Sequence, residues 1–311
     1  MHTVFIDSPA ADVIRRQELY KGQLFVFSPR PSALALCAFA RTLIEEAFGR
    51  LDPREAQYHM PVEDYAALLA TLKPRFINHP RSKELLQALL LDMGCDPHQT
   101  FFDVPRMRTS TSDGYLTTGI AYAWHPHRDT WYSAPMCQLN WWIPIYEIAS
   151  NNAMAFHPRY WDQPIRNDSS GYNYYEWNKY HRPAASQFLK EDPRPLPRPL
   201  EPVDLEPQIR LIPPAGSIII FSAAQVHSSV PNTSGQTRFS IDFRTVHRDD
   251  VEAKDGARNI DSACTGTSLR DFMRVSDLAP IPDELIARYS DGTEISGELV
   301  YQPANLDTSR Q

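Results

Sequence analysis

The sequence has few cysteines, no excess of positive charge and no long hydrophobic run. Its four cysteines, Cys37, Cys95, Cys137 and Cys264, form no C-x-x-C pair, so nothing indicates a zinc ribbon or a disulfide framework. Lysine and arginine total 31 against 38 acidic residues, a net charge of −7, which argues against nucleic acid or an anionic membrane as the main partner. No run of about 18 apolar residues predicts a membrane span. We therefore expect a cytoplasmic protein that acts on a small molecule.

Glycine is also scarce, with 12 residues, whereas proline is frequent, with 27 of the 311 residues. Apolar residues make up 42% of the chain and charged residues 22%. These fractions are typical of a soluble globular protein and exclude disordered, collagen-like and coiled-coil classes. The chain is long enough to bury a large core, and we expect a single domain over residues 1–311.

The first hundred residues carry mostly helical patterns. A run of strand-forming residues at 22–29 is followed by three stretches with helix-period apolar residues, at 32–49, 62–72 and 82–93. Serine begins the first and third of these stretches, and glycine follows both, as is typical of helix ends. We therefore expect residues 1–100 to form a mainly helical support.

Short runs of β-branched and aromatic residues dominate the chain from Phe101 onward. They predict strands within 101–112, 115–124, 136–148, 153–161, 208–212, 217–221 and 237–246. Helices followed by a split set of short strands favour the α+β class with a β-sandwich or jelly-roll core. We expect this core to comprise residues 101–161 and 208–247, followed by a tail of loops and short helices at 248–311.

The segment 162–207 interrupts the series of strands. A connection of this length is uncommon in a compact domain and is usually a functional lid or disordered. Its first half is rich in aromatic residues, which have apolar faces and polar tips suited to covering a small molecule. We expect Tyr174 and Trp177 to contact the substrate. The alternative is a fixed surface excursion that packs on the helices.

His127 and Asp129 form an H-x-D pair that is suited to metal binding. On an extended chain, residues two apart project from the same face roughly 6.6 Å apart, so their side chains can converge on one ion. His227, which follows a buried apolar run, is the candidate third ligand. Two histidines and one carboxylate form the facial triad that leaves positions open on Fe(II) for oxygen activation. We therefore predict a catalytic iron site formed by these three residues.

A second cluster of polar residues follows His227 by 11 positions. Arg238 and Ser240 share one face of an alternating strand, whose other face carries Phe239 and other apolar residues. A guanidinium fork pairs with a carboxylate through two hydrogen bonds, so Arg238 suits a dicarboxylate co-substrate. Arg244 shares this parity, and either contacts a polar substrate or forms an internal ion pair with Asp242.

With these residues, the sequence resembles the iron(II)/2-oxoglutarate-dependent oxygenases, and in particular the phytanoyl-CoA dioxygenase-like family of small-molecule hydroxylases. The resemblance covers roughly residues 101–246. It places the family's metal ligands on His127, Asp129 and His227, and its co-substrate arginine on Arg238. The Pro-Gly-Ser-His sequence usual in the family is absent. The intact Asp129 argues against the related halogenases, in which glycine or alanine replaces this carboxylate.

The resemblance implies a double-stranded β-helix and an oxidative reaction that uses Fe(II), 2-oxoglutarate and O2 and releases succinate and CO2. The expected product is a hydroxylated small molecule of specialised, natural-product metabolism, with desaturation, cyclisation or epimerisation as other outcomes. Ser240 is expected to help Arg238 hold the co-substrate. Gln138 and Asn140 either hydrogen-bond 2-oxoglutarate or satisfy buried polar groups.

Three alternatives remain open on the residues alone. In the first, His125, which has the strand parity of His127, is the metal ligand in place of His127, in an H-x-H arrangement like that of the cupins. The glutamate of the cupin pattern is missing, however. A jelly roll without oxygen chemistry, such as a cupin-like isomerase or binding protein, is a different class of function. A zinc hydrolase with an activated water is the third alternative, but it leaves Arg238 unexplained.

Overall fold

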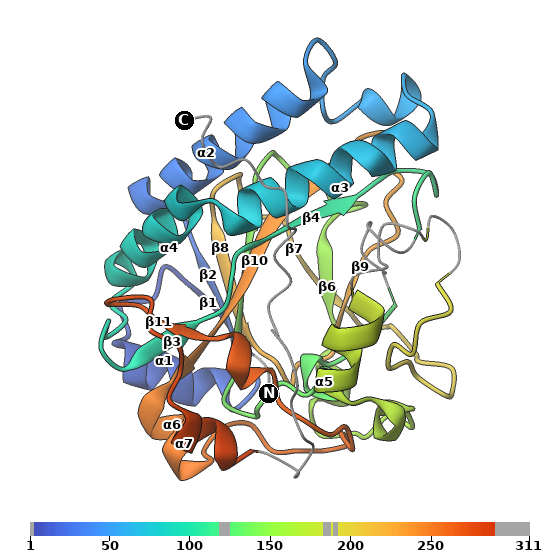
Figure 1. The fold of residues 1–311 in the computed structure, drawn as a ribbon. Helices are drawn as coiled ribbons and strands as arrows, with labels where there is room; N and C mark the ends of the chain where they lie inside the picture. Colours follow the sequence, from blue (N-terminus) through green and yellow to red (C-terminus); the bar gives the residue numbers. More distant parts are fainter. Residues whose placement is uncertain (1–2, 118–124, 183–187, 189–191, 290–311) are drawn as a thin grey trace.

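The computed structural model describes residues 3–117, 125–182, 188 and 192–289 (Figure 1). Part of the predicted strand at 115–124 and the last 22 residues of the predicted tail, 290–311, therefore lie outside the described residues. The described chain combines helices with two β-sheets, which confirms the mixed helical and sheet content that we expected. None of its helices is both long and apolar enough to cross a membrane.

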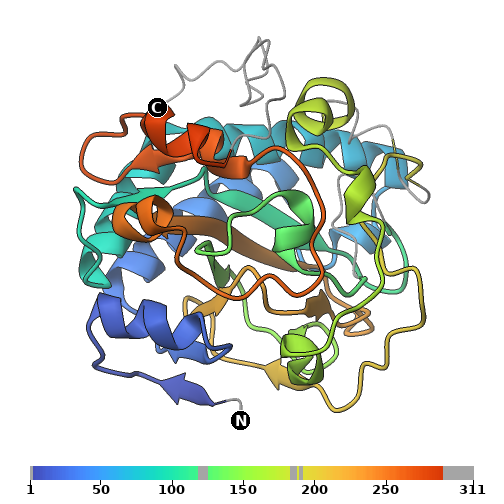
Figure 2. The same cartoon turned by 90° about the horizontal axis from the view of Figure 1, so that it is seen from below.

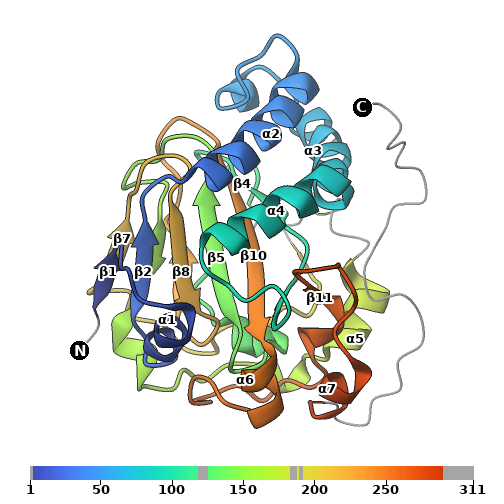
Figure 3. The ribbon, with the colours of Figure 1, turned by 90° about the vertical axis from the view of Figure 1, so that its left-hand side faces the viewer.

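Helices of the first hundred residues cover one face of the larger sheet (Figure 3). They are α1 (Asp12–Leu19), α2 (Pro31–Phe48), α3 (Val62–Asn78) and α4 (Pro80–Asp92). Helix α3 continues past the predicted end at residue 72 and contains Pro74. A proline inside a helix removes one backbone hydrogen bond, but Phe76 beyond it is fully buried in the core. Burial of this apolar side chain offsets that loss.

The larger sheet has eight strands in the order β1-β2-β8-β5-β10-β3-β11, with β4 also paired to β10. In chain order they are β1 (Val4–Ile6), β2 (Leu24–Phe27), β3 (Thr100–Phe102), β4 (Arg106–Ser110), β5 (Leu139–Pro144), β8 (Ile218–Ser222), β10 (Arg238–His247) and β11 (Met273–Arg274). The mainly helical segment thus also supplies two strands to the sheet, and the parallel pairing of β1 with β2 was not predicted.

The smaller sheet consists of β7 (Ile209–Leu211), β6 (Met154–Phe156) and β9 (His227–Ser229), with β6 in the middle. The sequence placed His227 at the end of the buried run that forms β8. In the structure a turn closed by a hydrogen bond from the Gln225 amide to the Ser222 carbonyl (2.9 Å) ends β8. His227 therefore begins a separate strand in the other sheet.

Strand β10 separates the apolar core from the polar cluster. Phe239, Ile241 and Phe243 are fully buried in the cluster that includes the helices. Arg238, Asp242 and the other residues of this parity project to the opposite face, because successive side chains of a strand alternate. Three of these, Arg238, Asp242 and Arg244, line the cleft described below, so the predicted alternation positions the site.

The remaining chain forms short helical turns and loops around the two sheets. Within 162–207 the described helical pieces include α5 (Tyr174–Glu176) and a π-helical turn at Trp177–His181. Helices α6 (Arg248–Ala253) and α7 (Asp283–Ala287) follow β10. Figure 2 shows the orange-red segment between α6 and α7 crossing below the sheet and approaching the yellow-green 162–207 segment, where Asn173 pairs with Thr265.

Candidate metal centre

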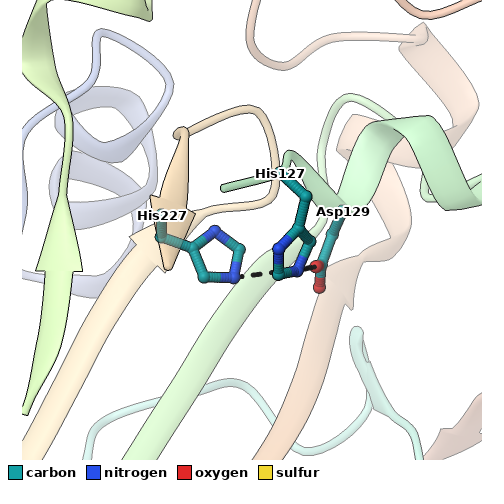
Figure 4. A group of neighbouring side chains, drawn as sticks. All are labelled: His127, Asp129 and His227. Atoms are coloured by element: carbon teal, nitrogen blue, oxygen red, sulfur yellow. Dashed lines mark ion pairs between the residues drawn. The ribbon is translucent and has the colours of Figure 1, made fainter. Parts of the chain in front are cut away.

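His127, Asp129 and His227 meet at one point (Figure 4). All three are buried, and one potential ligand atom from each lies within 4.8 Å of the others. The two histidines form an isolated β-bridge, in which the amide of each donates to the carbonyl of the other at 3.0 Å. This bridge joins the loop before Asp129 to β9, and it holds the two ring centroids 4.4 Å apart.

The backbone conformation at Asp129 differs from the prediction. The sequence suggested an extended H-x-D segment, but Asp129 instead begins a 3-10 turn that spans Asp129–Tyr132. Its Oδ1 atom lies 3.4 Å from Nε2 of His127 and 3.8 Å from Nε2 of His227. The turn thus directs the carboxylate toward both imidazoles.

Backbone carbonyls determine which ring nitrogen of each histidine faces Asp129. Nδ1 of His127 donates to the His125 carbonyl, and Nδ1 of His227 donates to the Gln225 carbonyl, both at 3.0 Å. In a neutral imidazole this leaves the Nε2 lone pair available. Histidines that bind a metal through one ring nitrogen typically donate a hydrogen bond from the other ring nitrogen. The donor set therefore fits a divalent ion.

The environment favours the protonation states that metal binding requires. Burial, reinforced by the neighbouring His127, lowers the pKa of His227 to about 3, so its imidazole is neutral near pH 7. Burial alone would raise the pKa of Asp129, but the interaction with His127 and the charge of Arg244 outweigh it and hold this pKa below its ordinary value. The site therefore combines a neutral imidazole with an anionic carboxylate, as a metal centre needs.

Sequence reasoning missed the side chains that hold this loop. Arg128, between the two predicted ligands, is buried and pairs with Asp261 at 3.1 Å. It also donates to the carbonyls of Ala224 and Gln163. Asp261 in turn accepts a hydrogen bond from the Trp131 indole at 2.7 Å. No local pattern pointed to Asp261, since it lies more than 130 positions after Arg128 in the chain.

Arg238 is a buried cation without a carboxylate partner among the described residues. Its guanidinium donates to the Asn152 carbonyl at 2.7 Å and to the Ser229 hydroxyl at 2.8 Å, and it lies over the Trp142 ring. Its Nε–H has no hydrogen-bond partner in the described structure. Burial lowers the pKa of Arg238 to about 10, so it remains charged near neutral pH.

One cleft is lined by the three clustered residues together with Asn140, Arg238 and Arg244. Ser240 lies on the same face of β10, is fully buried, and its hydroxyl has no hydrogen-bond partner in the described structure. Gln138 is buried and donates its amide to Asn140 at 3.0 Å. Gln138 thus satisfies a neighbouring polar group, whereas Asn140 faces the cleft.

Tyr174 and Trp177 do not line this cleft. The Tyr174 hydroxyl donates to Asp271, and Trp177 packs against Tyr172 with the Arg194 guanidinium 5.0 Å from its ring centroid. The 162–207 segment nevertheless approaches the site, and the Tyr132 side chain lies between the two. Tyr132 contacts both the His127 ring and the Tyr172 ring, each at a centroid distance of 5.5 Å.

Arg244 and His125 occupy positions beside the cluster. Arg244 forms the ion pair with Asp242 that the sequence suggested, at 3.3 Å, and a further ion pair with Asp129 at 3.6 Å. His125 is 3.2 Å from the Tyr132 hydroxyl and is not part of the three-residue cluster. The H-x-H alternative therefore finds no support in this geometry.

No protein-family model matches the chain, and no curated protein matches it. Among solved structures, EvdO2 from Micromonospora carbonacea var. aurantiaca is 12% identical, with a TM-score of 0.41 and coverage of 76% of this chain and 91% of that one. SnoN, described as a non-heme alpha ketoglutarate dependent epimerase from nogalamycin biosynthesis, is 15% identical, with a TM-score of 0.35 and coverage of 76% and 84%. SnoK, described as a carbocyclase from the same biosynthesis, is 14% identical, with a TM-score of 0.34 and coverage of 72% of both chains.

Proposed function

We propose that the protein is an Fe(II)- and 2-oxoglutarate-dependent oxygenase that oxidises an unactivated C–H bond of a small molecule, with hydroxylation as the simplest outcome. The observation that carries this proposal is the buried convergence of two imidazole Nε2 atoms and one carboxylate oxygen. This donor set is characteristic of non-heme iron oxygenases, because it leaves three coordination positions for co-substrate and oxygen.

His127, Asp129 and His227 would hold the iron. When bound, iron with 2-oxoglutarate and O2 couples the decarboxylation of the co-substrate, which yields succinate and CO2, to oxidation of the substrate. The chain's own residues orient the ligands through the carbonyls of His125 and Gln225 and exclude water by burial.

Arg238 would bind the distal carboxylate of 2-oxoglutarate. Its charge is buried in the same cleft and has no carboxylate partner among the described residues, and a buried cation is favourable only when an anion or several hydrogen bonds compensate it. The Ser240 hydroxyl, which has no hydrogen-bond partner in the described part of the chain and lies on the same strand face, supplies a further donor. Asn140 lines the cleft and Gln138 holds its amide oxygen, so we assign both to the co-substrate side.

The proposed architecture is a double-stranded β-helix built from the larger sheet and the β7-β6-β9 sheet, with residues 1–100 as support and 248–311 as tail. The site lies where a loop and β9 are joined by the His127–His227 bridge. We propose that the 162–207 segment, with Tyr174 and Trp177, covers the small-molecule substrate, and that Arg244 faces it. The contact from Tyr172 through Tyr132 to His127 supports this placement of the segment.

The buried Arg238 favours oxygenase chemistry over the two alternatives. A cupin-like isomerase or binding protein requires the metal ligands, but it does not require a buried cation that has no carboxylate partner among the described residues. A zinc hydrolase also leaves this cation without a role.

Succinate formation tests the proposal. The purified protein is supplied with Fe(II), 2-oxoglutarate, O2 and a panel of small molecules, and succinate is quantified by chromatography. We expect iron-dependent succinate from the wild type, and none above background from His127→Ala or His227→Ala. His98→Ala, which removes an exposed histidine, is the matched control and should retain full activity. Metal binding without succinate would favour the non-oxidative alternative, and full activity in His127→Ala would contradict the ligand assignment.

A further inference from the structure

We infer that Arg244 is a positioning residue for the carboxylate of Asp129, and that it determines which oxygen of this carboxylate faces the metal. This inference rests on the proposed function, because it concerns the same metal site. It is carried by the ion pair between Nε of Arg244 and Oδ2 of Asp129, at 3.6 Å.

The three proposed ligands are oriented in different ways. Each histidine is oriented by a hydrogen bond to a nearby backbone carbonyl, two residues before it in the chain. The two oxygens of Asp129 face different groups: Oδ1 faces both imidazole Nε2 atoms, whereas Oδ2 faces Arg244. Arg244 thus orients the carboxylate of Asp129, as the backbone carbonyls orient the two histidine rings. Pairing of Oδ2 leaves Oδ1 as the ligand atom and opposes two-oxygen binding to the metal.

Arg244 is itself fixed by two other carboxylates. Its backbone amide donates to Oδ1 of Asp103 at 2.7 Å, and its Nη1 lies 3.4 Å from Oδ2 of the same residue. Its Nη2 lies 3.3 Å from Asp242. Three different nitrogens of one planar guanidinium therefore meet three carboxylates. Lysine has a single charged nitrogen and does not reproduce this arrangement.

Removal of Arg244 has two opposite consequences for metal binding. Loss of a positive charge near a divalent ion relieves repulsion, which by itself tightens metal binding. Loss of an outer partner that orients a ligand weakens metal binding, typically tenfold to hundredfold. We expect weaker binding, because Arg244 contacts the ligand group directly. The sign of the change therefore separates positioning from a general charge effect.

The affinity of three variants for cobalt shows whether metal binding weakens or tightens. Co(II) is titrated under anaerobic conditions into metal-free wild type, Arg244→Met, Arg244→Lys and Arg108→Met, and the dissociation constant is obtained by calorimetry. Arg108 is the matched control, because it lines the same cleft and pairs with Asp242 at 2.7 Å, but no ion pair joins it to Asp129. We expect tenfold or more weakening for Arg244→Met, partial recovery for Arg244→Lys, and unchanged or tighter binding for Arg108→Met.

Circular dichroism and thermal unfolding of each metal-free variant show whether it is folded. If folded Arg244→Met binds Co(II) as tightly as the wild type, or more tightly, the positioning role is wrong while the metal site stands. Equal weakening in Arg108→Met also overturns it, since the effect would then be common to any cleft arginine. Failure of the wild type itself to bind Co(II) would instead contradict the proposed function. Should Arg244→Met be unfolded, Arg244→Lys decides by the same comparison.

Discussion

At the scale of single residues, the environment of Arg238 most directly indicates that an anionic ligand binds there. It is 5% exposed, and its described partners are a carbonyl and a hydroxyl, neither of which carries charge. A hydrogen bond to a charged group contributes about 1.5–3 kcal/mol. The co-substrate assigned here would provide such bonds.

We therefore predict that Arg238→Leu raises the KM for 2-oxoglutarate about tenfold to hundredfold, the ratio that corresponds to this free energy. Steady-state succinate formation at varied 2-oxoglutarate measures the change. Arg41→Leu is the control, because the partly buried Arg41 is also bonded to a carbonyl, that of Ile145, but on the helix side of the sheet. An unchanged KM in folded Arg238→Leu would show that the co-substrate binds elsewhere.

At the scale of elements, the segment between α6 and α7 holds the loop that carries two of the proposed ligands. Asp261 accepts hydrogen bonds from Arg128, from the Trp131 indole and from the Ile165 amide. The same carboxylate thus connects the metal loop, the 162–207 segment and the C-terminal part of the chain.

We predict that Asp261→Ala lowers the free energy of unfolding by about 3–5 kcal/mol, because it leaves the buried Arg128 cation without its carboxylate. Metal affinity should fall as well, since Arg128 lies between His127 and Asp129. Urea unfolding and Co(II) titration measure the two effects. Asp204→Ala removes the partner of Arg159 at an exposed surface and should change both much less. Comparable losses in the two variants would argue against the anchoring role.

Only part of this element-level arrangement follows from the sequence. The apolar period predicted α2 and α4 closely, because local burial patterns report the buried face of a helix. The aromatic residues at 172–177 suggested substrate contact, which stays a prediction, whereas the hydrogen bond from Tyr174 to Asp271 was not foreseen. Which surface an aromatic cluster packs against depends on segments distant in the chain, so no local pattern reports it.

At the scale of the whole molecule, the buried histidines couple stability to pH. Burial, with the neighbouring His127, lowers the pKa of both His125 and His227 to about 3. In the unfolded chain the same groups titrate near pH 6.5. Below that pH the unfolded state binds more protons than the folded state, so stability falls as the pH decreases from about 6.5 toward 3.

We predict that the metal-free protein loses about 1.4 kcal/mol per pH unit for each of these two histidines once the pH is below about 6. Urea unfolding at pH 7.5, 6 and 5 measures this dependence. His125→Asn and His227→Asn should each reduce the slope. A stability that does not change between pH 6 and 5 would contradict the prediction.

The sequence by itself determined the helical support, the alternation of β10 and the residue types of the metal centre, because each of these depends on spacing along a short segment. Only the tertiary structure decided that His227 begins a separate strand and that Asp129 turns toward both histidines. It alone also brought Arg244 to Asp129 and Asn152 to Arg238. These partners lie about 85 to 115 positions apart and meet through the pairing of strands. Hydrophobic periodicity specifies which face of an element is buried, whereas the register and order of the strands specify which polar side chains meet there.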